Sequence, residues 1–342
     1  MKQEPVYKTR YGATYCGDSI NLIGQLEDCS VDLVITSPPF ALLRKKEYGN
    51  ESQEDYVAWL GEFGRRMHPK LKDTGSFVID LGGAYVKGKP IRSLYNFKVL
   101  VYFCETLGYN LAEEFYWFNP SKLPSPIEWV NKRKIRVKDS VNTVWWFSKT
   151  DHPKSDIKKV LSPYSDRMKK LIQDPEKFYT PKKRPSGHDI SSSFNVDNGG
   201  AIPSNLLQIS NSESNSKYLA ICKALGVKAH PARFPCKLPE FFVKMLTDED
   251  DVVVDIFAGS CTTGEACEKL KRNWKCFELD RGYIAASAFR FSSRNAAKAK
   301  EIYDVIRGGG HVDSILDVAI AADSAVANDK LVIAEPFFDF SD

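Results

Sequence analysis

The sequence lacks the features that mark a membrane protein, a disulfide-rich secreted protein or a zinc protein. No apolar run approaches the roughly 20 residues that cross a bilayer, and the mean hydropathy is −0.34. The first residues, Met1–Pro5, have no apolar signal-peptide core. The 8 cysteines contain no Cys-x-x-Cys pair, so neither a disulfide framework nor a zinc site is expected. These absences favour a globular protein with free thiols in a reducing, cytoplasmic setting.

Two common phosphate-binding loops are also missing. The small-residue loop Ala258–Gly264, after the predicted strand Val252–Phe257, is not Gly-x-Gly-x-x-Gly and has no Gly-Lys-Ser/Thr. Small residues still let a ligand approach the backbone closely. Glu278 ends the next predicted strand, Trp274–Glu278, where a carboxylate can accept hydrogen bonds from both ribose hydroxyls. The pattern predicts an adenosine-containing ligand without a pyrophosphate; the alternative is a tight strand–helix connection with a surface acid.

The segment Ser37–Phe40, Ser-Pro-Pro-Phe, follows an apolar run, Val31–Thr36, that predicts a buried strand. Each proline lacks an N–H group and holds φ near about −65°. The loop carbonyls therefore stay free to face a cleft, and Phe40 adds a flat apolar surface. Such a corner suits a planar ring held by its exocyclic amine, although a simple tight turn after a strand is the alternative.

The middle of the chain differs from its ends. Residues 1–114 and 230–305 alternate strand-like and helix-like segments, which predicts a doubly wound, mostly parallel α/β sheet. Residues 115–229 are rich in Pro, Ser, Asn and Lys and hold 20 Lys and Arg against 10 Asp and Glu. This excess predicts an inserted, loop-rich lobe that binds a polyanion, unless it is only a solvated face. Residues 306–342 form a tail without an assigned role. The sequence also predicts a strand at Ser76–Leu81 and helices at Ser19–Leu26, Gln53–Met67, Leu94–Leu107 and Leu238–Leu246.

The two signatures resemble those of DNA amino-methyltransferases. Ser37–Phe40 resembles their catalytic Ser/Asp/Asn-Pro-Pro-Phe/Tyr motif, and Asp255–Gly264 resembles their S-adenosylmethionine loop, Asp-x-Phe-x-Gly-Ser-Gly-Thr-Thr-Gly. The catalytic motif comes first, which is the circularly permuted order of the bacterial β class found in restriction–modification systems. The resemblance spans roughly residues 11–295 and includes the runs Tyr116–Pro126 and His230–Pro235.

The resemblance implies an S-adenosylmethionine-dependent methyltransferase fold and methyl transfer to the N4 amine of cytosine in duplex DNA, because Ser-Pro-Pro-Phe is typical of the N4-cytosine subgroup. N6-adenine methylation is the nearest alternative. The implied target is a palindrome, with CAGCTG the first to test. The expected partner besides DNA is a cognate restriction endonuclease, functionally but not physically, and the expected state is a monomer or weak dimer. No metal is expected, since the methyl donor carries its own positive charge.

The expected catalytic residues are Ser37, Pro38, Pro39, Phe40 and Asp80. Asp80 lies at the end of a predicted strand that could neighbour Ser37, where it would accept or orient a proton. The resemblance implies these cofactor-binding residues: Asp18, Phe234, Pro235, Asp255, Phe257, Gly259, Ser260, Thr262 and Glu278. Asp18 could instead cap the helix Ser19–Leu26. Cys261 stands where the family usually has glycine, and we expect its side chain beside the methionine moiety, which leaves its effect on cofactor affinity open.

DNA binding is expected to use base flipping, with Phe40 stacking on the cytosine. The predicted phosphate contacts are Lys132, Arg133, Lys134, Arg136 and Lys138. Base-reading side chains are expected between residues 151 and 215, and the candidates are Arg184, His188 and Asn198.

Three other functions remain open from the sequence. A C5-cytosine methyltransferase would use the cysteine of Pro235-Cys236, although its place before a helix predicts packing instead. A protein-glutamine or RNA methyltransferase could share the grip on an amine. A non-catalytic DNA-binding protein would have lost cofactor binding through Cys261.

Overall fold

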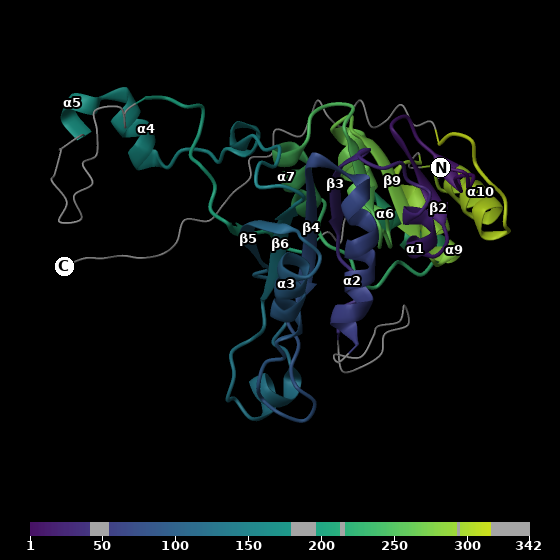
Figure 1. The fold of residues 1–342 in the computed structure, drawn as a ribbon, viewed down its shortest axis with the longest axis horizontal. Coiled ribbons are helices and arrows are strands. Elements are labelled where there is room, and N and C mark those ends of the chain that lie inside the picture. The colour runs from purple at the N-terminus through teal and green to yellow at the C-terminus, as the bar shows by residue number, and fades with distance from the viewer. Residues whose placement is uncertain (42–54, 179–195, 213–215, 293–294, 316–342) are drawn as a thin grey trace. The chain divides into compact units, whose positions relative to one another are not determined.

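The computed structural model describes residues 1–41, 55–178, 196–212, 216–292 and 295–315, which belong to two compact units (Figure 1). The larger unit contains Met1–Ser155 and the described chain from Asn205 onward. The smaller unit, Asp156–Ser204, holds the 3-10 turn η3 (Ile157–Val160) and helices α4 (Asp166–Gln173) and α5 (Pro175–Phe178). None of the described helices is long and apolar enough to cross a membrane.

A nine-stranded sheet organises the larger unit, in the order β1-β2-β9-β8-β3-β4-β6-β5-β7. Five neighbouring pairs are parallel, and β1–β2, β4–β6 and β6–β5 are antiparallel. The predicted mostly parallel α/β sheet is therefore confirmed. The strands are β1 (Tyr7–Lys8), β2 (Gly12–Cys16), β3 (Val31–Thr36), β4 (Leu71–Gly82), β5 (Asn110–Phe118), β6 (Val141–Ser148), β7 (Leu206–Gln208), β8 (Val252–Asp255) and β9 (Asn273–Glu278).

Helices cover both faces of this sheet. On one face α1, α2 and α3 pack in a single core with alternate strand residues such as Phe77 and Phe147. On the other face Phe242 of α7 packs edge-on against Phe115 of β5, with 5.1 Å between ring centroids. The helices of this unit are α1 (Ser19–Ile23), α2 (Tyr56–Met67), α3 (Tyr95–Glu105), α6 (Lys217–Leu225), α7 (Lys237–Leu246), α8 (Thr262–Lys269), α9 (Arg281–Ser287) and α10 (Ala296–Arg307), with short turns η1 (His68–Lys70), η2 (Glu128–Lys132) and η5 (Ala288–Arg290).

The strands β3 and β8 lie side by side in parallel at the centre of the sheet, where Leu33 pairs with Val253 and Val34 with Val254. The chain leaves β8 through α8 toward β9 on one side, and it leaves β3 through α2 toward β4 on the other. Connections that part in this way leave a crevice at the carboxyl ends of the strands, which is where open α/β sheets bind ligands.

The predicted elements are present, and their ends differ by a few residues. The strand β3 has the predicted bounds, whereas β8 ends at Asp255, before the predicted Phe257. The chain turns there because the Asp255 carboxylate accepts a hydrogen bond from the Phe257 N–H group at 3.1 Å. The turn brings the small-residue loop over the end of the strand.

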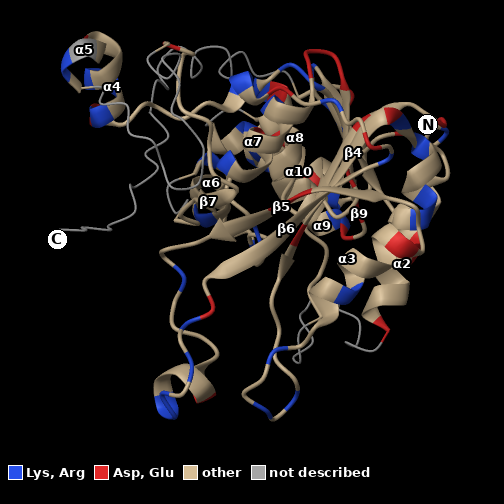
Figure 2. Cartoon of the chain, turned by 60° about the vertical axis from the view of Figure 1, so that its left-hand side comes forward, with Lys and Arg blue, Asp and Glu red and all other residues tan. Residues whose placement is uncertain are grey.

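Two segments, residues 84–93 and 119–140, leave the same edge of the sheet as loops that carry Lys and Arg (Figure 2); we call them together the basic arm. Arg92 Nη1 pairs with Asp139 Oδ2 at 2.6 Å, and Arg136 Nε donates to the Pro90 carbonyl at 2.8 Å. The strands β6 and β7 also lie between residues 115 and 229, within the main sheet. The functional division at residues 115 and 229 stays a prediction.

Candidate active site

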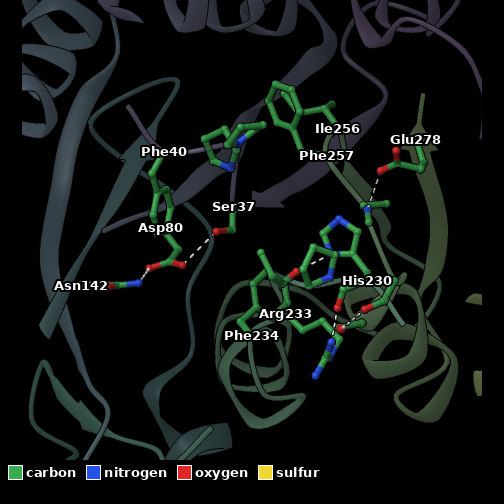
Figure 3. A pocket seen from close by; sticks show the side chains of 18 of the residues that line it. Ser37, Phe40, Asp80, Asn142, His230, Arg233, Phe234, Ile256, Phe257 and Glu278 are labelled. Atoms are coloured by element: carbon green, nitrogen blue, oxygen red, sulfur yellow. Dashed lines mark hydrogen bonds between the residues drawn. The ribbon is translucent and has the colours of Figure 1, made fainter. Parts of the chain in front are cut away.

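A cavity of about 800 Å³ opens at the carboxyl edge of the sheet, between the ends of β3 and β8 (Figure 3). Small-molecule sites usually occupy about 300–1,000 Å³. Its wall includes both the Ser37–Phe40 corner and, except for Cys261, the loop from Phe257 to Thr262. Thr36 Oγ1 donates to Asp255 Oδ1 at 2.7 Å and so ties the two strand ends together. The two signatures therefore meet at one site.

Most of the predicted catalytic and cofactor residues line this cavity. Those on its wall are Asp18, Ser37, Pro38, Pro39, Phe40, Asp80, Phe234, Phe257, Gly259, Ser260, Thr262 and Glu278. Two predicted cofactor residues, Asp255 and Pro235, are not on the wall. Asp255 is buried behind the loop, where its carboxylate accepts hydrogen bonds from Thr36 and Thr263. Pro235 precedes α7, and its carbonyl accepts the Leu238 N–H group. In the structure, Asp255 fastens the loop to the sheet.

Ser37, Asp80 and Asn142 form a hydrogen-bonded chain at the catalytic end of the cavity (Figure 3). Ser37 Oγ donates to Asp80 Oδ2 at 3.0 Å, and Asn142 Nδ2 donates to Asp80 Oδ1 at 3.0 Å. The parallel pairing of β3 with β4 brings Ser37 beside Asp80, as predicted. Burial raises the pKa of Asp80 to about 6, against the opposing effects of these two hydrogen bonds and the charge of Lys122. The site therefore holds a carboxylate that is more basic than usual.

Phe40 lies on the cavity wall against the end of β4. A Cβ atom at Gly82 would come within 2.4 Å of the Phe40 ring, so any larger residue there would displace the ring. The Tyr95 hydroxyl donates to the Gly82 carbonyl and fixes the same strand end. Phe40 is thus packed on one side and open to the cavity on the other.

Glu278 lies at the opposite end of the cavity, and its role as a ribose-binding carboxylate stays a prediction. Its two oxygens accept the N–H groups of Gly259 and Asp280 at 2.8 and 2.9 Å. Burial raises its pKa. A carboxylate oxygen has more than one lone pair, so each oxygen can accept a second hydrogen bond from a ligand in the cavity.

Cys261 does not line the cavity, which corrects the expectation that its side chain lies beside the methionine moiety. Its φ of 57° is in the left-handed region, which explains why glycine is usual at this position. The Cys261 side chain is buried in the core and packs against Gly264. A Cβ atom added to Gly264 would lie only 2.5 Å from Cys261 Sγ. The loop therefore keeps its shape on the cavity side.

Asp18 combines the two roles that the sequence left open. It lies on the cavity wall, and its carboxylate caps α1 by accepting the Ile20 N–H group at 2.8 Å. The cap holds the side chain at the edge of the cavity, and a contact with a cofactor stays a prediction.

Several cavity residues were not predicted from the sequence. Trp59 and Phe63 of α2 pack on Phe257 with ring centroids 5.5 and 4.8 Å apart, and they add an aromatic wall. Their spacing of four residues on a helix is typical of core packing, so it carried no functional signal. Polar side chains on the wall to which the sequence assigned no individual role in the site are Ser19, Asn119, Lys122, Asn142, Asn211, Ser212, His230 and Arg233.

The predicted phosphate-binding residues Lys132, Arg133, Lys134, Arg136 and Lys138 all lie exposed on the basic arm. Lys132 and Arg133 share an ion pair with Glu128, at 3.3 and 3.0 Å. Lys138 Nζ donates to the carbonyls of Pro120 and Lys122 at 3.1 and 3.3 Å and so supports the arm itself.

Of the three candidate base-reading residues, the structure describes Asn198. Arg184 and His188 lie outside the described residues. Asn198 belongs to the smaller unit, where its N–H group donates to the Tyr164 hydroxyl at 2.7 Å. Base reading stays a prediction for all three.

Cys236 is not on the cavity wall, and burial raises the pKa of its thiol to about 12. A thiol with this pKa is a poor nucleophile near neutral pH. The structure thus agrees with the packing role predicted for Cys236. Within the described ranges, no cluster of three or more His, Cys, Asp or Glu side chains could hold a metal ion.

A doubly wound sheet that carries a diproline corner beside a buried carboxylate, in a cavity at its carboxyl edge, is the architecture of an amino-methyltransferase. A family model described as "DNA methylase" matches residues 31–289, and the chain belongs to this family. It is 64% identical over 313 residues to the type II methyltransferase M.PvuII of Proteus hauseri, covering 91% of this chain and 93% of that protein. It is 27% identical over 277 residues to M.BglII of Bacillus subtilis, covering 81% and 68%.

A solved structure agrees with these relatives. The structure of "PvuII DNA methyltransferase (cytosine-N4-specific)" matches with a TM-score of 0.75 and 54% sequence identity. The match covers 91% of this chain and 98% of that one. The circularly permuted methyltransferase fold expected from the sequence is therefore the fold of this protein.

Proposed function

We propose that this protein is the modification methyltransferase of a type II restriction–modification system and methylates the N4 amine of a flipped cytosine in duplex DNA. One observation carries the proposal: the Ser37–Phe40 corner, with Ser37 bonded to Asp80, opens into the same cavity as the Phe257–Thr262 loop. The similarity to M.PvuII, in sequence and in structure, supports the same activity, since the matching solved structure is that of a cytosine-N4-specific enzyme.

The residues present fit S-adenosylmethionine as the cofactor. Glu278 has free acceptor sites for two ribose hydroxyls, and Trp59 and Phe63 offer aromatic surface beside Phe257. The loop from Gly259 to Thr262 would hold the methionine end. When bound, S-adenosylmethionine supplies an electrophilic methyl group on a positively charged sulfur.

Ser37 and Pro38 hold the amine of the target base. The Ser37 hydroxyl donates a hydrogen bond to Asp80, so the lone pairs of Ser37 Oγ are free to accept a hydrogen bond from one N4–H group of cytosine. The Pro38 carbonyl accepts the other. The cytosine amine is a weak nucleophile because its lone pair is delocalised into the ring, and two acceptors favour a pyramidal nitrogen with a directed lone pair. Most of the rate gain then comes from positioning and from these oxygen dipoles.

Asp80 completes the proton path. The nitrogen must lose a proton once it is methylated, and Ser37 Oγ can pass that proton to the Asp80 carboxylate. A carboxylate with a pKa of about 6 is ionised at neutral pH and is a stronger base than an exposed one. Asn142 holds the other carboxylate oxygen and fixes its orientation.

DNA is held by the basic arm, which leaves the same sheet edge as the cavity, and the base is read by the region between residues 151 and 215. A palindromic site such as CAGCTG can be modified one strand at a time, so a monomer or weak dimer suffices. The endonuclease acts on the same site without binding this protein. The eight free cysteines fit the reducing bacterial cytoplasm.

The test is nucleoside mass spectrometry on duplex DNA. The purified protein is incubated with S-adenosylmethionine carrying a labelled methyl group and with a duplex that contains CAGCTG, and the digested nucleosides are identified. The expected product is N4-methylcytosine, formed only with the intact site and formed far more slowly by Ser37→Ala. N6-methyladenine as the product would replace the proposal with its nearest alternative, and 5-methylcytosine or unlabelled DNA would refute it.

A further inference from the structure

Arg290 is a buried arginine that contacts the cofactor loop on the side that faces away from the cavity. It ends the turn η5, is 4% exposed and is not on the cavity wall. Its Nε atom donates to the Ser260 carbonyl at 2.6 Å, and Nη2 donates to Ser260 Oγ and Thr262 Oγ1, both at 2.9 Å. One guanidinium therefore sets the backbone and both hydroxyls of two residues on the cavity wall.

The guanidinium itself is held in place by an acid. Arg290 Nη1 forms an ion pair with Glu265 of α8, which also pairs with Lys269 at 2.9 Å. Burial alone would raise the pKa of Glu265, but the charges of Arg290 and Lys269 bring it down to about 2. Glu265 is therefore ionised throughout the neutral range and holds the Arg290 guanidinium in position at the loop.

The other face of Arg290 connects to the second side of the cavity. The guanidinium lies 4.7 Å from the ring centroid of Tyr218, a buried residue of α6. The Tyr218 hydroxyl accepts the N–H group of His230 at 2.8 Å. His230 lies on the cavity wall, and a Cβ atom at Gly259 would come within 3.0 Å of its ring. The two residues thus reach both the loop and the segment that starts at His230.

We infer that Arg290 and Tyr218 form one positioning unit that sets the affinity of the site for the amino-acid end of S-adenosylmethionine. The unit acts through Ser260, Thr262 and His230 and does not touch the cofactor. This inference rests on the proposed function, since it takes the cofactor and the place of its methionine end from there.

The chemistry of arginine explains why the effect is specific. A guanidinium has five N–H donors and no acceptor, so a hydroxyl bonded to it must act as the acceptor and keeps its own proton for another partner. The Ser260 and Thr262 hydroxyl oxygens are 3.3 Å apart, so one can donate to the other and one proton remains for a ligand in the cavity. A hydroxyl donor oriented in this way suits a carboxylate.

The test compares Arg290→Gln with a matched control, Arg272→Gln. Arg272 is also buried, at 7% exposure against 4% for Arg290. It donates to the Thr247 side chain and carbonyl at 3.0 and 2.8 Å and is not on the cavity wall. Both variants remove a buried charge with several hydrogen bonds, so a general loss of stability affects both. Melting temperatures measured without ligand give the size of that loss.

Two ligands are titrated by calorimetry: S-adenosylhomocysteine, and 5′-methylthioadenosine, which lacks the amino-acid group. We expect Arg290→Gln to bind S-adenosylhomocysteine at least about tenfold more weakly, the effect of losing an oriented charge-assisted hydrogen bond. Its affinity for methylthioadenosine should stay within about twofold of wild type, as should both affinities of Arg272→Gln. Equal losses for the two ligands, or no loss for S-adenosylhomocysteine, would overturn the inference.

Arg290→Lys and Tyr218→Phe carry the test if Arg290→Gln does not fold. Lysine keeps the positive charge but lacks the planar guanidinium with its several N–H donors. We therefore expect a smaller loss of affinity for S-adenosylhomocysteine, still without a loss for methylthioadenosine. Tyr218→Phe keeps the ring under Arg290 and removes the acceptor for His230, and a weaker affinity for S-adenosylhomocysteine is again expected. Wild-type affinity in both variants would refute the inference. A wild-type protein that binds neither ligand would instead refute the proposed function.

Discussion

The cavity and the basic arm use charged side chains in opposite ways. In the cavity Asp80 is buried, accepts hydrogen bonds from two side chains and has a raised pKa. On the arm Lys132 and Arg133 are exposed and share Glu128. A buried charge is costly but fixed in one geometry, whereas an exposed ion pair contributes only about 0–1 kcal/mol and is screened by salt. The first environment suits proton transfer at a defined atom, and the second suits attraction of a polyanion.

The largest effect should come from removing the buried charge. We expect Asp80→Asn to lower the single-turnover methylation rate by about 10²- to 10⁴-fold, because the amide cannot accept a proton from Ser37. The same change should stabilise the protein at pH 8, because the raised folded pKa means that ionised Asp80 opposes folding by on the order of 3 kcal/mol. Thermal unfolding of the two proteins measures this difference.

The pH dependence checks the sign of this effect. The folded state holds the Asp80 proton more tightly than the unfolded state, so the stability gain of Asp80→Asn should be full above about pH 6 and vanish near pH 4. The wild-type rate should fall about tenfold per pH unit below pH 6, since it needs the ionised carboxylate. A methylation rate that is flat from pH 5 to 8 would show that ionised Asp80 is not the base. An Asp80→Asn protein that is less stable than wild type at pH 8 would show that the buried charge does not oppose folding.

A smaller loss is expected at the residue that Asp80 supports. Ser37→Ala removes one oriented acceptor for the cytosine amine and should reduce the rate by about 10²-fold, with cofactor affinity unchanged. Cys236→Ala serves as the control, and it should keep the wild-type rate because its thiol is outside the cavity. Single-turnover kinetics on both variants decide this point. If Cys236→Ala abolished methylation while Ser37→Ala did not, the enzyme would be a C5-cytosine methyltransferase.

DNA binding by the basic arm should depend on salt concentration and not on pH. Lys134→Gln should weaken DNA binding and lower the slope of log K against log[salt] by about 1, the value for one phosphate contact. The matched control is Lys298→Gln, an exposed lysine on α10. Fluorescence anisotropy with a labelled duplex at several salt concentrations measures both slopes. Equal slopes for Lys134→Gln and wild type would remove Lys134 from the DNA interface.

The smallest effect is expected at Cys261. Because its side chain packs in the core against Gly264, Cys261→Ala should leave the affinity for S-adenosylhomocysteine within about twofold of wild type. The melting temperature should fall modestly, since a buried sulfur is lost. Calorimetry and thermal unfolding separate the two effects. A large change in affinity would mean that Cys261 contacts the cofactor after all.

Local sequence patterns predicted the elements because those patterns act over a few residues. The apolar run before Ser37 specified β3 with its bounds, and the small-residue loop after β8 was placed correctly. The neighbourhood of Ser37 and Asp80 was predictable because both follow strands of one parallel sheet. Trp59 and Phe63 were missed because a helix residue that faces a cavity has the same spacing as one that faces the core.

The direction of a side chain was harder to predict than its presence in a motif. Cys261 and Asp255 belong to the cofactor motif, yet both turn away from the cavity. For Cys261 the left-handed backbone decides this, and for Asp255 the hydroxyls of Thr36 and Thr263 do. Contacts with residues far away in the chain carry no local signal.

By itself the sequence determined the order of strands and helices, the two signatures and the basic character of the arm, because each depends on residues close together in the chain. Only the tertiary structure decided which side chains meet: the pairing of β3 with β8, the raised pKa of Asp80, and the reach of Arg290 from η5 to the cofactor loop. These depend on burial and on contacts between segments up to more than 200 residues apart, such as the hydrogen bond from Thr36 to Asp255. A one-dimensional pattern does not contain them.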